Sequence, residues 1–93
     1  MREIEYSNAF KRDYKKCAVE SLSSSLIEAL YFLINDKPLP EKYCDHALTG
    51  EWKGFRDCHI QPDLVLNLVL IYRKVEDDKL ELLRIGSHSH LFG

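Results

Sequence analysis

The stretch from Cys44 to Asp63, CDHALTGEWKGFRDCHIQPD, concentrates side chains that can move protons or hold phosphate. It contains His46 and His59 with neighbouring carboxylates, and it adds the cations Lys53 and Arg56. An imidazole has an ordinary pKa of roughly 6.5, so it can accept and donate a proton near neutral pH. Two histidines with cations that hold a phosphate are what metal-free RNA cleavage by the 2′-hydroxyl requires.

The histidines lie at the ends of predicted strands. His46 precedes the first long strand, His59 ends it, Asp63 lies in the following turn, and His88 follows the last strand. If the outer strands are neighbours in the sheet, the imidazoles and Asp63 converge at one edge. The remaining histidine, His90, has no partner suggested by its spacing, so we expect a surface role for it.

Metal binding is an alternative interpretation of the same residues, since Cys44-x-His46 and Cys58-His59 supply zinc-type ligands. Adjacent strand residues point to opposite faces, however, so Cys58 and His59 cannot both reach one ion. The spacing matches no zinc motif, and we expect no metal and no other cofactor. Cys44 and Cys58 are then packing residues, and Trp52 is interpreted as a core residue rather than a base-stacking platform.

The composition fits one globular domain over residues 1–93, with 45% hydrophobic and 30% charged residues. Three cysteines without a close CxxC pair favour reduced thiols. No apolar signal region opens the chain, and the apolar run Leu64–Tyr72 is too short to span a membrane, so we expect a cytoplasmic protein. The formal net charge of −2, without a basic tail, argues against strong sequence-independent binding to duplex DNA.

The first half of the chain predicts a strand and two helices. The alternation in Arg2–Tyr6 indicates a strand, and Ser7 is a candidate N-cap for a helix whose apolar face carries Phe10, Tyr14, Cys17 and Ala18. A broader apolar face over 26–34 predicts a more deeply packed second helix, which the prolines within 35–40 end.

The second half predicts three strands, over 52–60, 64–75 and 79–85, joined as an antiparallel meander. In the first of these strands, Asp57 and His59 share one face. The apolar residues of the last strand do not keep to one face, so that strand is covered on both faces or bulged. The order predicts an α+β fold in which a helical hairpin covers one face of an antiparallel sheet and the other face is left for chemistry.

From Pro38 onward the residues themselves look like those of a known family. The segments PLPEKYCDHALTGEWKGFRDCHIQPD, LIYRK and RIGSHSHLFG closely resemble the YafQ branch of the RelE/ParE superfamily of bacterial type II toxins. The resemblance is strong over Pro38–Gly93, and the first 37 residues fit in layout more than in letters. It implies a RelE-like fold with a short C-terminal tail.

The resemblance implies a ribosome-dependent messenger-RNA endonuclease that cuts the codon in the ribosomal A site. In such enzymes the 2′-hydroxyl attacks the neighbouring phosphate and no metal is needed. The family motifs place the catalytic positions on His46, His59, Asp63, His88 and Phe92 of this chain. We assign His59 and His88 as the proton-transfer pair, His46 and Asp63 as orienting or assisting groups, and Phe92 as the ring that holds a base or the RNA backbone.

The resemblance also implies partners. Basic family positions match Lys53, Arg56 and Arg84, which would neutralise phosphate, although Lys53 and Arg56 could equally be ordinary solvated strand residues. Toxins of this kind are encoded with a DinJ- or RelB-like antitoxin of the ribbon-helix-helix type. The expected complex has two copies of each protein and meets operator DNA only through the antitoxin.

Two departures from the family leave alternatives open. The pI of about 6.1 is low for such toxins, and Leu64–Leu70 makes the spacing after Asp63 about four residues longer, an even number that preserves the faces of the strand. A catalytically impaired module that mainly binds an antitoxin and regulates transcription is therefore the second hypothesis. The gyrase-poisoning branch of the superfamily is the third, less favoured because the histidines suit RNA chemistry.

Overall fold

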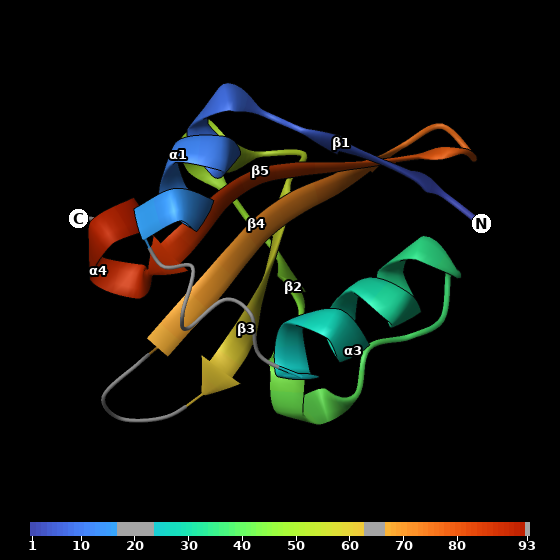
Figure 1. Ribbon diagram of the computed structural model, residues 1–93, viewed down its shortest axis with the longest axis horizontal. Helices are drawn as coiled ribbons and strands as arrows, with labels where there is room; N and C mark the ends of the chain where they lie inside the picture. The colour runs from blue at the N-terminus through green and yellow to red at the C-terminus, as the bar shows by residue number, and fades with distance from the viewer. Residues whose placement is uncertain (17–23, 63–66, 93) are drawn as a thin grey trace.

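The computed structural model describes residues 1–16, 24–62 and 67–92. Figure 1 shows the elements in their order along the chain. They are β1 (Glu3–Tyr6), α1 (Asn8–Lys16), α3 (Ser24–Ile34), the 3-10 helix η1 (Glu41–Tyr43), β2 (His46–Ala47), the 3-10 helix η2 (Gly50–Trp52), β3 (Arg56–Pro62), β4 (Asn67–Val75), β5 (Lys79–Ser87) and α4 (His88–Phe92). None of the described helices is long and apolar enough to cross a membrane.

The five strands form one sheet in the order β1-β5-β4-β3-β2. The prediction of an α+β fold with a meander of three long strands is confirmed, with β3, β4 and β5 pairing in antiparallel succession. The sheet as a whole is mixed, because β1 pairs with β5 in parallel. Parallel neighbours need a long connection, and the chain between β1 and β5 supplies it. The tail predicted after the last strand is the short helix α4.

The first helix begins and the second helix ends where the sequence predicts. Ser7 caps α1, since its hydroxyl accepts a hydrogen bond of 2.9 Å from the N–H of Phe10. Helix α3 ends at Ile34, and Asp36 then adopts a left-handed φ of 55° just before Pro38. Cys17 and Ala18, which the sequence places on the apolar face of the first helix, lie outside the described residues.

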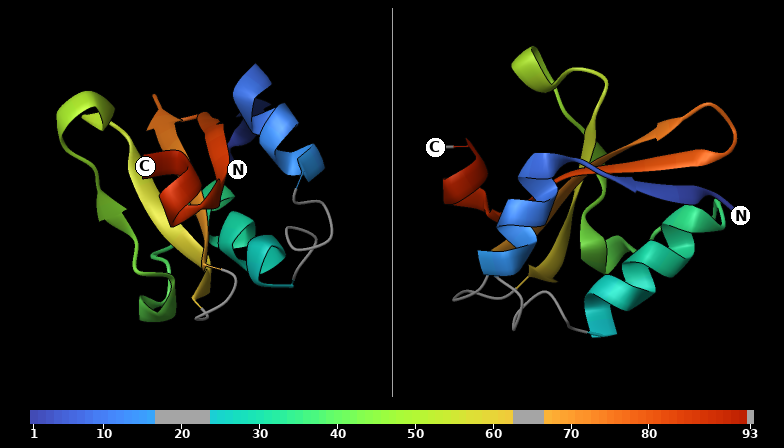
Figure 2. Two further views of the ribbon diagram at one scale, coloured as in Figure 1. Left: turned by 90° about the vertical axis from the view of Figure 1, so that its left-hand side faces the viewer. Right: turned by 45° about the horizontal axis from the view of Figure 1, so that its top comes forward.

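The main hydrophobic core lies between the sheet and the helices α1 and α3, which cover the same face (Figure 2). Its members from the sheet include Cys58, Ile60, Leu70, Tyr72, Leu80, Leu82 and Ile85. A second, smaller cluster of Val69, Ile71 and Leu91 lies on the opposite face and joins α4 to β4. Because Leu70 and Tyr72 face one way and Val69 and Ile71 the other, β4 is buried on both sides.

The predicted irregularity of the last strand is a bulge. Leu82 pairs with Tyr72, and Arg84 pairs with Ile71, so Leu83 is the extra residue of β5. The bulge returns the next apolar side chain to the helix side. This explains why the apolar residues of β5 follow no simple alternation in the sequence.

The connection between β3 and β4 contains part of the stretch Leu64–Leu70, which is predicted to be longer than the family's spacing. Residues 63–66 lie outside the described part of the chain, so the prediction of a bulge or a longer hairpin there stays a prediction. The end of that stretch, 68–70, belongs to β4 and is buried. The end of the predicted insertion is therefore part of a continuous central strand.

Candidate active site

Strand β3 presents Asp57 and His59 on the face of the sheet opposite α1 and α3. Their neighbours Cys58 and Ile60 are fully buried in the core beneath the helices. Side chains alternate along a strand, so Asp57 and His59 point the other way, as the sequence predicts. The shared face brings a carboxylate and an imidazole to the side of the sheet that the long helices leave uncovered.

The edge strand β2, which the sequence did not predict, sets His46 directly opposite Asp57. Nδ1 of His46 lies 2.9 Å from the carbonyl oxygen of Cys44 and 2.9 Å from Oδ1 of Asp57. The carbonyl oxygen of Cys44 can only accept, so a hydrogen bond between the two requires a proton on Nδ1, and Nε2 is the other ring nitrogen. The side chain is 54% exposed, which leaves this nitrogen within reach of a substrate.

Asp57 is a buried carboxylate whose side chain is 1% exposed. Neither of its oxygens receives a hydrogen bond from a described residue, because the Nδ1–H of His46 is directed at Cys44. Burial raises the pKa of Asp57 above its ordinary value of 3.8, although the positive charges of His46, His59 and His88 act in the opposite direction. A buried carboxylate without hydrogen bonds destabilises the fold, and such groups are typical of a functional site rather than of a packed core.

The other two predicted catalytic histidines also lie around Asp57. The half-buried ring of His59 has its centroid 6.5 Å from that of His46. His88 opens α4, is exposed, and is close enough to act electrostatically on Asp57. The structure thus gathers three imidazoles, from β2, β3 and α4, around one carboxylate.

The route by which His88 reaches this place differs from the one that the sequence suggested. The strands β3 and β5 are not neighbours, since β4 lies between them. Instead, α4 turns back over β4 and packs Leu91 on Val69 and Ile71. The N–H of His90 donates to the hydroxyl of Ser87 at 3.1 Å, which caps this short helix.

Aromatic rings border the histidine cluster. The ring of Phe92 has its centroid 4.8 Å from that of His88 and 6.4 Å from that of Trp52. Trp52 also contacts Phe55 edge-to-face at 5.9 Å. Trp52 packs against the second core cluster, in line with its predicted core role, and remains half-buried. Phe92 therefore lies between His88 and the ring of Trp52.

Two of the three predicted phosphate-binding cations are engaged by carboxylates. The guanidinium of Arg56 donates to Asp45 at 3.1 and 3.3 Å. Arg84 donates to Asp13 of α1 at 2.6 and 3.1 Å. Lys53 is exposed and forms no ion pair within the described part of the chain. Of the three, Lys53 is thus the cation that no carboxylate of the described residues engages.

Two aspartates remain: Asp63, which was predicted as a site residue, and Asp57, which was not. Asp63 lies outside the described residues, so its proposed assisting role stays a prediction. Asp57 was not among the predicted site residues, although the sequence places it on the face of His59. That shared face, two residues from a candidate catalytic histidine, was the signal that could have identified it. Across residues 1–16, 24–62 and 67–92, no group of three or more metal-ligating side chains could hold a metal ion.

Comparison with known proteins identifies the family of this chain. Residues 2–93 match the family described as bacterial toxin of type II toxin-antitoxin system, YafQ. The chain belongs to the YafQ toxin family. A Haemophilus influenzae protein named for the YafQ toxin is 48% identical, covering 94% of this chain and 88% of its own length. The mRNA interferase toxin YafQ of Escherichia coli K12 is 40% identical over 99% of this chain and 97% of its own.

Solved structures of YafQ proteins share the fold. The crystal structure of YafQ from E. coli BL21(DE3) has a TM-score of 0.82 and 39% identity, covering 100% of both chains. YafQ in the E. coli DinJ-YafQ toxin-antitoxin complex has a TM-score of 0.80 and 40% identity, covering 99% of this chain and 98% of that one. The predicted family, the RelE-like fold of YafQ and the assignment to an RNA-cleaving enzyme family are confirmed.

Proposed function

We propose that this chain is an mRNA interferase that acts in the bacterial cytoplasm on messenger RNA in the ribosomal A site. The observation that carries the proposal is the gathering of His46, His59 and His88 around the buried carboxylate of Asp57. Membership of the YafQ family and the mRNA interferase name of the E. coli relative support it. A cognate antitoxin, as in the DinJ-YafQ complex, would neutralise the activity.

The proposed reaction transfers protons at both ends of one phosphodiester. One imidazole takes the proton of the 2′-hydroxyl, whose oxygen attacks the adjacent phosphorus. A protonated imidazole gives its proton to the 5′-oxygen as the phosphorus–oxygen bond breaks. The products are a 2′,3′-cyclic phosphate and a 5′-hydroxyl, and each proton transfer supplies typically about 10² to 10⁴ in rate.

The roles that we assign to the side chains are those that the family resemblance implies. His59 and His88 form the proton-transfer pair, and His46, with Asp63 as a further candidate, orients or assists. Asp57 would place a negative charge beside the imidazoles when it is ionised, where it can stabilise positive charge that develops during proton transfer. Phe92, beside His88, holds a base or the RNA backbone.

Few cations in the structure are free to bind the phosphate in the proposed reaction. Lys53 would neutralise the phosphate, while Arg56 and Arg84 would have to leave Asp45 and Asp13 to contribute. Side chains alone would supply the catalysis.

The test is to add the purified chain to a translating bacterial extract and to map the 5′ ends of a defined message. We expect cuts within codons that depend on ribosomes and disappear in a His59→Ala, His88→Ala double variant. The matched control is His90→Ala, which changes an exposed histidine of the same helix α4 and should cut like the wild type. Cutting by the double variant at the wild-type rate would overturn the proposed chemistry.

A second candidate is a catalytically impaired YafQ-fold module that mainly binds an antitoxin. The ion pairs of Arg56 with Asp45 and of Arg84 with Asp13 favour it, because they lower the positive charge available to RNA. A folded wild-type chain that binds its antitoxin tightly but leaves the message uncut would support this candidate over the first.

A further inference from the structure

Arg56 points to the face of the sheet that the long helices cover, away from the histidines. It lies directly opposite Tyr72 in the pairing of β3 with β4, and the side chains of such a pair share one face. The ring of Tyr72 belongs to the core beneath the helices. Asp57 and His59 alternate with these positions and point to the other face. The side chain that the family resemblance assigned to phosphate and the histidine cluster therefore lie on opposite sides of β3.

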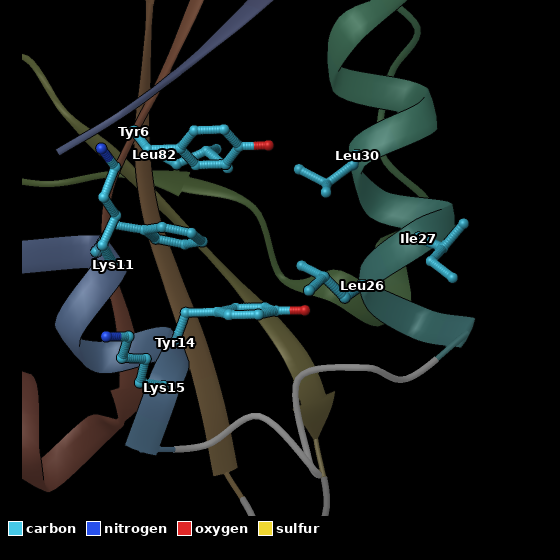
Figure 3. Close-up of a pocket in the computed structure, with 9 residues that line it drawn as sticks. Tyr6, Lys11, Tyr14, Lys15, Leu26, Ile27, Leu30 and Leu82 are labelled. Carbon is cyan, nitrogen blue, oxygen red and sulfur yellow. The ribbon is translucent and has the colours of Figure 1, made fainter. Parts of the chain in front are cut away.

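This helix-covered face carries hollows of different character. One, between α1 and α3, has a volume of about 540 Å³ and is mainly apolar, with the rings of Tyr6 and Tyr14 reaching towards the leucines of α3 (Figure 3). Another has a volume of about 340 Å³ and lies at the end of α3, where Leu33 and Leu39 line it together with side chains of both charges. Arg56 is one of these charged side chains. Its surroundings are thus those of the second, polar hollow.

Asp45 is the partner that holds Arg56 in this hollow. Nε and Nη2 of Arg56 donate to the two carboxylate oxygens of Asp45 at 3.3 and 3.1 Å. The hydroxyl of Tyr72 donates to the same carboxylate. Because the side chain of Tyr72 is buried in the core, it ties the half-buried carboxylate to a part of the fold that packing keeps in place.

The residue that follows Asp45 is His46, whose side chain lies on the other face. Side chains alternate along a strand, and His46 opens β2 opposite Asp57. On the other side of Asp45, Cys44 has a left-handed φ of 48°, and its carbonyl oxygen lies 2.9 Å from Nδ1 of His46. Asp45 therefore connects the turn that orients the imidazole with the strand that carries it.

We propose that Asp45 is the positioning residue of His46 in the cleavage reaction, and that Arg56 and Tyr72 act through Asp45 rather than on the phosphate. This inference rests on the proposed function, in which His46 orients or assists. The strand β2 has two residues, lies at the edge of the sheet and pairs on one side only. A carboxylate clamped on one face limits how far the imidazole on the other face can turn. A misplacement of about 1 Å can slow an enzyme about a hundredfold, so loosening the clamp should lower the rate.

A direct role of Arg56 at the phosphate fits the structure less well. To reach a phosphate beside His59, the guanidinium would have to break both hydrogen bonds to Asp45 and pass round the edge strand β2. Asp45 would then keep only the hydroxyl of Tyr72 from this set of donors. The clamp on the segment that carries His46 would be loosened in the same step. Phosphate binding by Arg56 and positioning of His46 therefore oppose each other.

The chain offers a matched ion pair with which to separate positioning from stability. Arg73 donates to Glu81 at 2.9 to 3.3 Å between β4 and β5. The side chains of this pair are 44% and 28% exposed, against 44% and 26% for Arg56 and Asp45. Glu81 pairs in the sheet with Arg73 and Glu5, and not with the strands β2 and β3. Glu81→Ala is therefore the control for Asp45→Ala.

The experiment measures kcat and KM for the cutting of message on programmed ribosomes. Asp45→Ala should lower kcat about tenfold and leave KM within about twofold, because the geometry of the reacting groups changes and binding does not. Asp45→Asn keeps Oδ1, which accepts from Tyr72 and from Nε of Arg56, so it should retain more of the rate. Glu81→Ala should cut within about twofold of the wild type, although it removes a similar ion pair.

Double variants identify the residue through which each side chain acts. Arg56→Ala should lower kcat on its own and have no further effect in the Asp45→Ala background. Asp45→Ala should likewise have no further effect in the His46→Ala background, in which His59 and His88 remain. An effect of Arg56→Ala that persists in full without Asp45, or that appears in KM, would assign Arg56 to the phosphate and overturn the proposal. A loss from Asp45→Ala that persists in full without His46 would overturn it as well.

The imidazole of His46 supplies a readout that does not depend on cleavage. The nitrogen chemical shifts of the ring show which nitrogen carries the proton, and this depends on the hydrogen bond that the ring makes. Asp45→Ala should change these shifts by mixing the two tautomers, whereas Glu81→Ala should leave them as in the wild type. Unchanged shifts of His46 in a folded Asp45→Ala variant would overturn the proposal. A wild-type chain that leaves the message uncut would contradict the proposed function, and the shifts would still show whether Asp45 positions His46.

Discussion

Nδ1 of His46 lies 2.9 Å from Oδ1 of Asp57, a carboxylate whose side chain is 1% exposed. The two residues face each other across the pairing of β2 with β3. Water screens a buried charge poorly, so the carboxylate acts strongly on imidazoles nearby. In the ionised form Asp57 stabilises an imidazolium, and this is its proposed contribution to the histidine cluster.

Replacing Asp57 by Asn should lower the cleavage rate roughly ten- to a hundred-fold while the shape of the site is kept. Without the negative charge, an imidazolium that forms during proton transfer loses an electrostatic partner. The variant should therefore stay slower than the wild type across the pH range of the assay. The measurement is the cutting rate on programmed ribosomes between about pH 6 and pH 8.

The stability of the same variant distinguishes catalysis from packing. Burial raises the pKa of Asp57, so the folded state holds this proton more tightly than the unfolded state does. Stability from this group is present at low pH and is lost as pH rises through the raised pKa. Asp57→Asn removes that cost, and its Tm at pH 7 should equal or exceed that of the wild type. A lowered Tm together with lost activity would indicate a packing role instead.

Tyr72 offers a second prediction, since its hydroxyl donates to Asp45, the residue before His46. Burial and the hydrogen bond to Asp45 raise the pKa of Tyr72, so it remains a donor at neutral pH. Tyr72→Phe should cost about 1 kcal/mol of unfolding free energy. It should also reduce cleavage several-fold, because Asp45 loses the hydrogen bond that helps to hold the start of β2, and with it His46, in position.

The matched control for Tyr72→Phe is Tyr43→Phe. The Tyr43 side chain is also buried, but its hydroxyl donates to Glu28 of α3 at 2.9 Å. Both variants should lose similar stability in urea titrations, and only Tyr72→Phe should slow cleavage. Equal effects on cleavage would show that the loss follows stability rather than the position of His46.

Local pattern predicted much of this fold. The Ser7 cap, the end of the second helix and the alternation that puts Cys58 and Asp57 on opposite faces each depend on a few neighbouring residues. Such features follow from backbone geometry and from the period of a strand or helix. These predictions were correct because the packing of distant elements did not change the local structure at these positions.

Long-range pairing could not be predicted in the same way. The strand β2 has only two residues and carries no periodicity, and its register is fixed by contact with β3. Arg84 was assigned to phosphate, yet it meets Asp13, which lies 71 positions away in the sequence. The place of His88 depends on α4 crossing β4 through Leu91. Each depends on which distant elements meet, and sequence spacing does not contain that information.

Gly86 gives a third prediction, because it lies beneath the helix that carries His88. A Cβ at this position would stand 3.4 Å from Cδ2 of His90 and 3.5 Å from Cδ2 of Leu91. Gly86→Ala should be accommodated by a small shift and should keep most of the activity. Gly86→Val adds two methyl groups against α4, so it should displace His88 and lower cleavage at least tenfold.

The measurement for the Gly86 pair is the cleavage rate beside the near-ultraviolet circular dichroism of Trp52, which contacts Phe92 of α4. We expect the valine variant to change the spectrum and the rate together, with the alanine variant close to wild type in both. An active valine variant with a wild-type spectrum would contradict the proposed seating of α4.

The ion pair of Asp13 with Arg84 gives the last prediction, on acid stability. Burial of Asp13 opposes ionisation, but the hydrogen bonds from Arg84 and from the N–H of Ile85 outweigh it and lower the pKa of Asp13 below 3.8. Stability from a lowered carboxyl pKa is fully present above pH 3.8 and is lost as pH falls through the lowered value. Asp13→Asn should therefore cost about 1.5 to 3 kcal/mol at pH 7.

The difference between wild type and Asp13→Asn should shrink as pH falls below 3.8, because the wild-type carboxyl then becomes neutral as well. Urea titrations at neutral and acid pH measure it. The control is Asp36→Asn, which removes the exposed partner of Arg2 and Lys74 and should cost much less. A difference that stays constant down to pH 2 would show that Asp13 stabilises the fold by packing rather than by its charge.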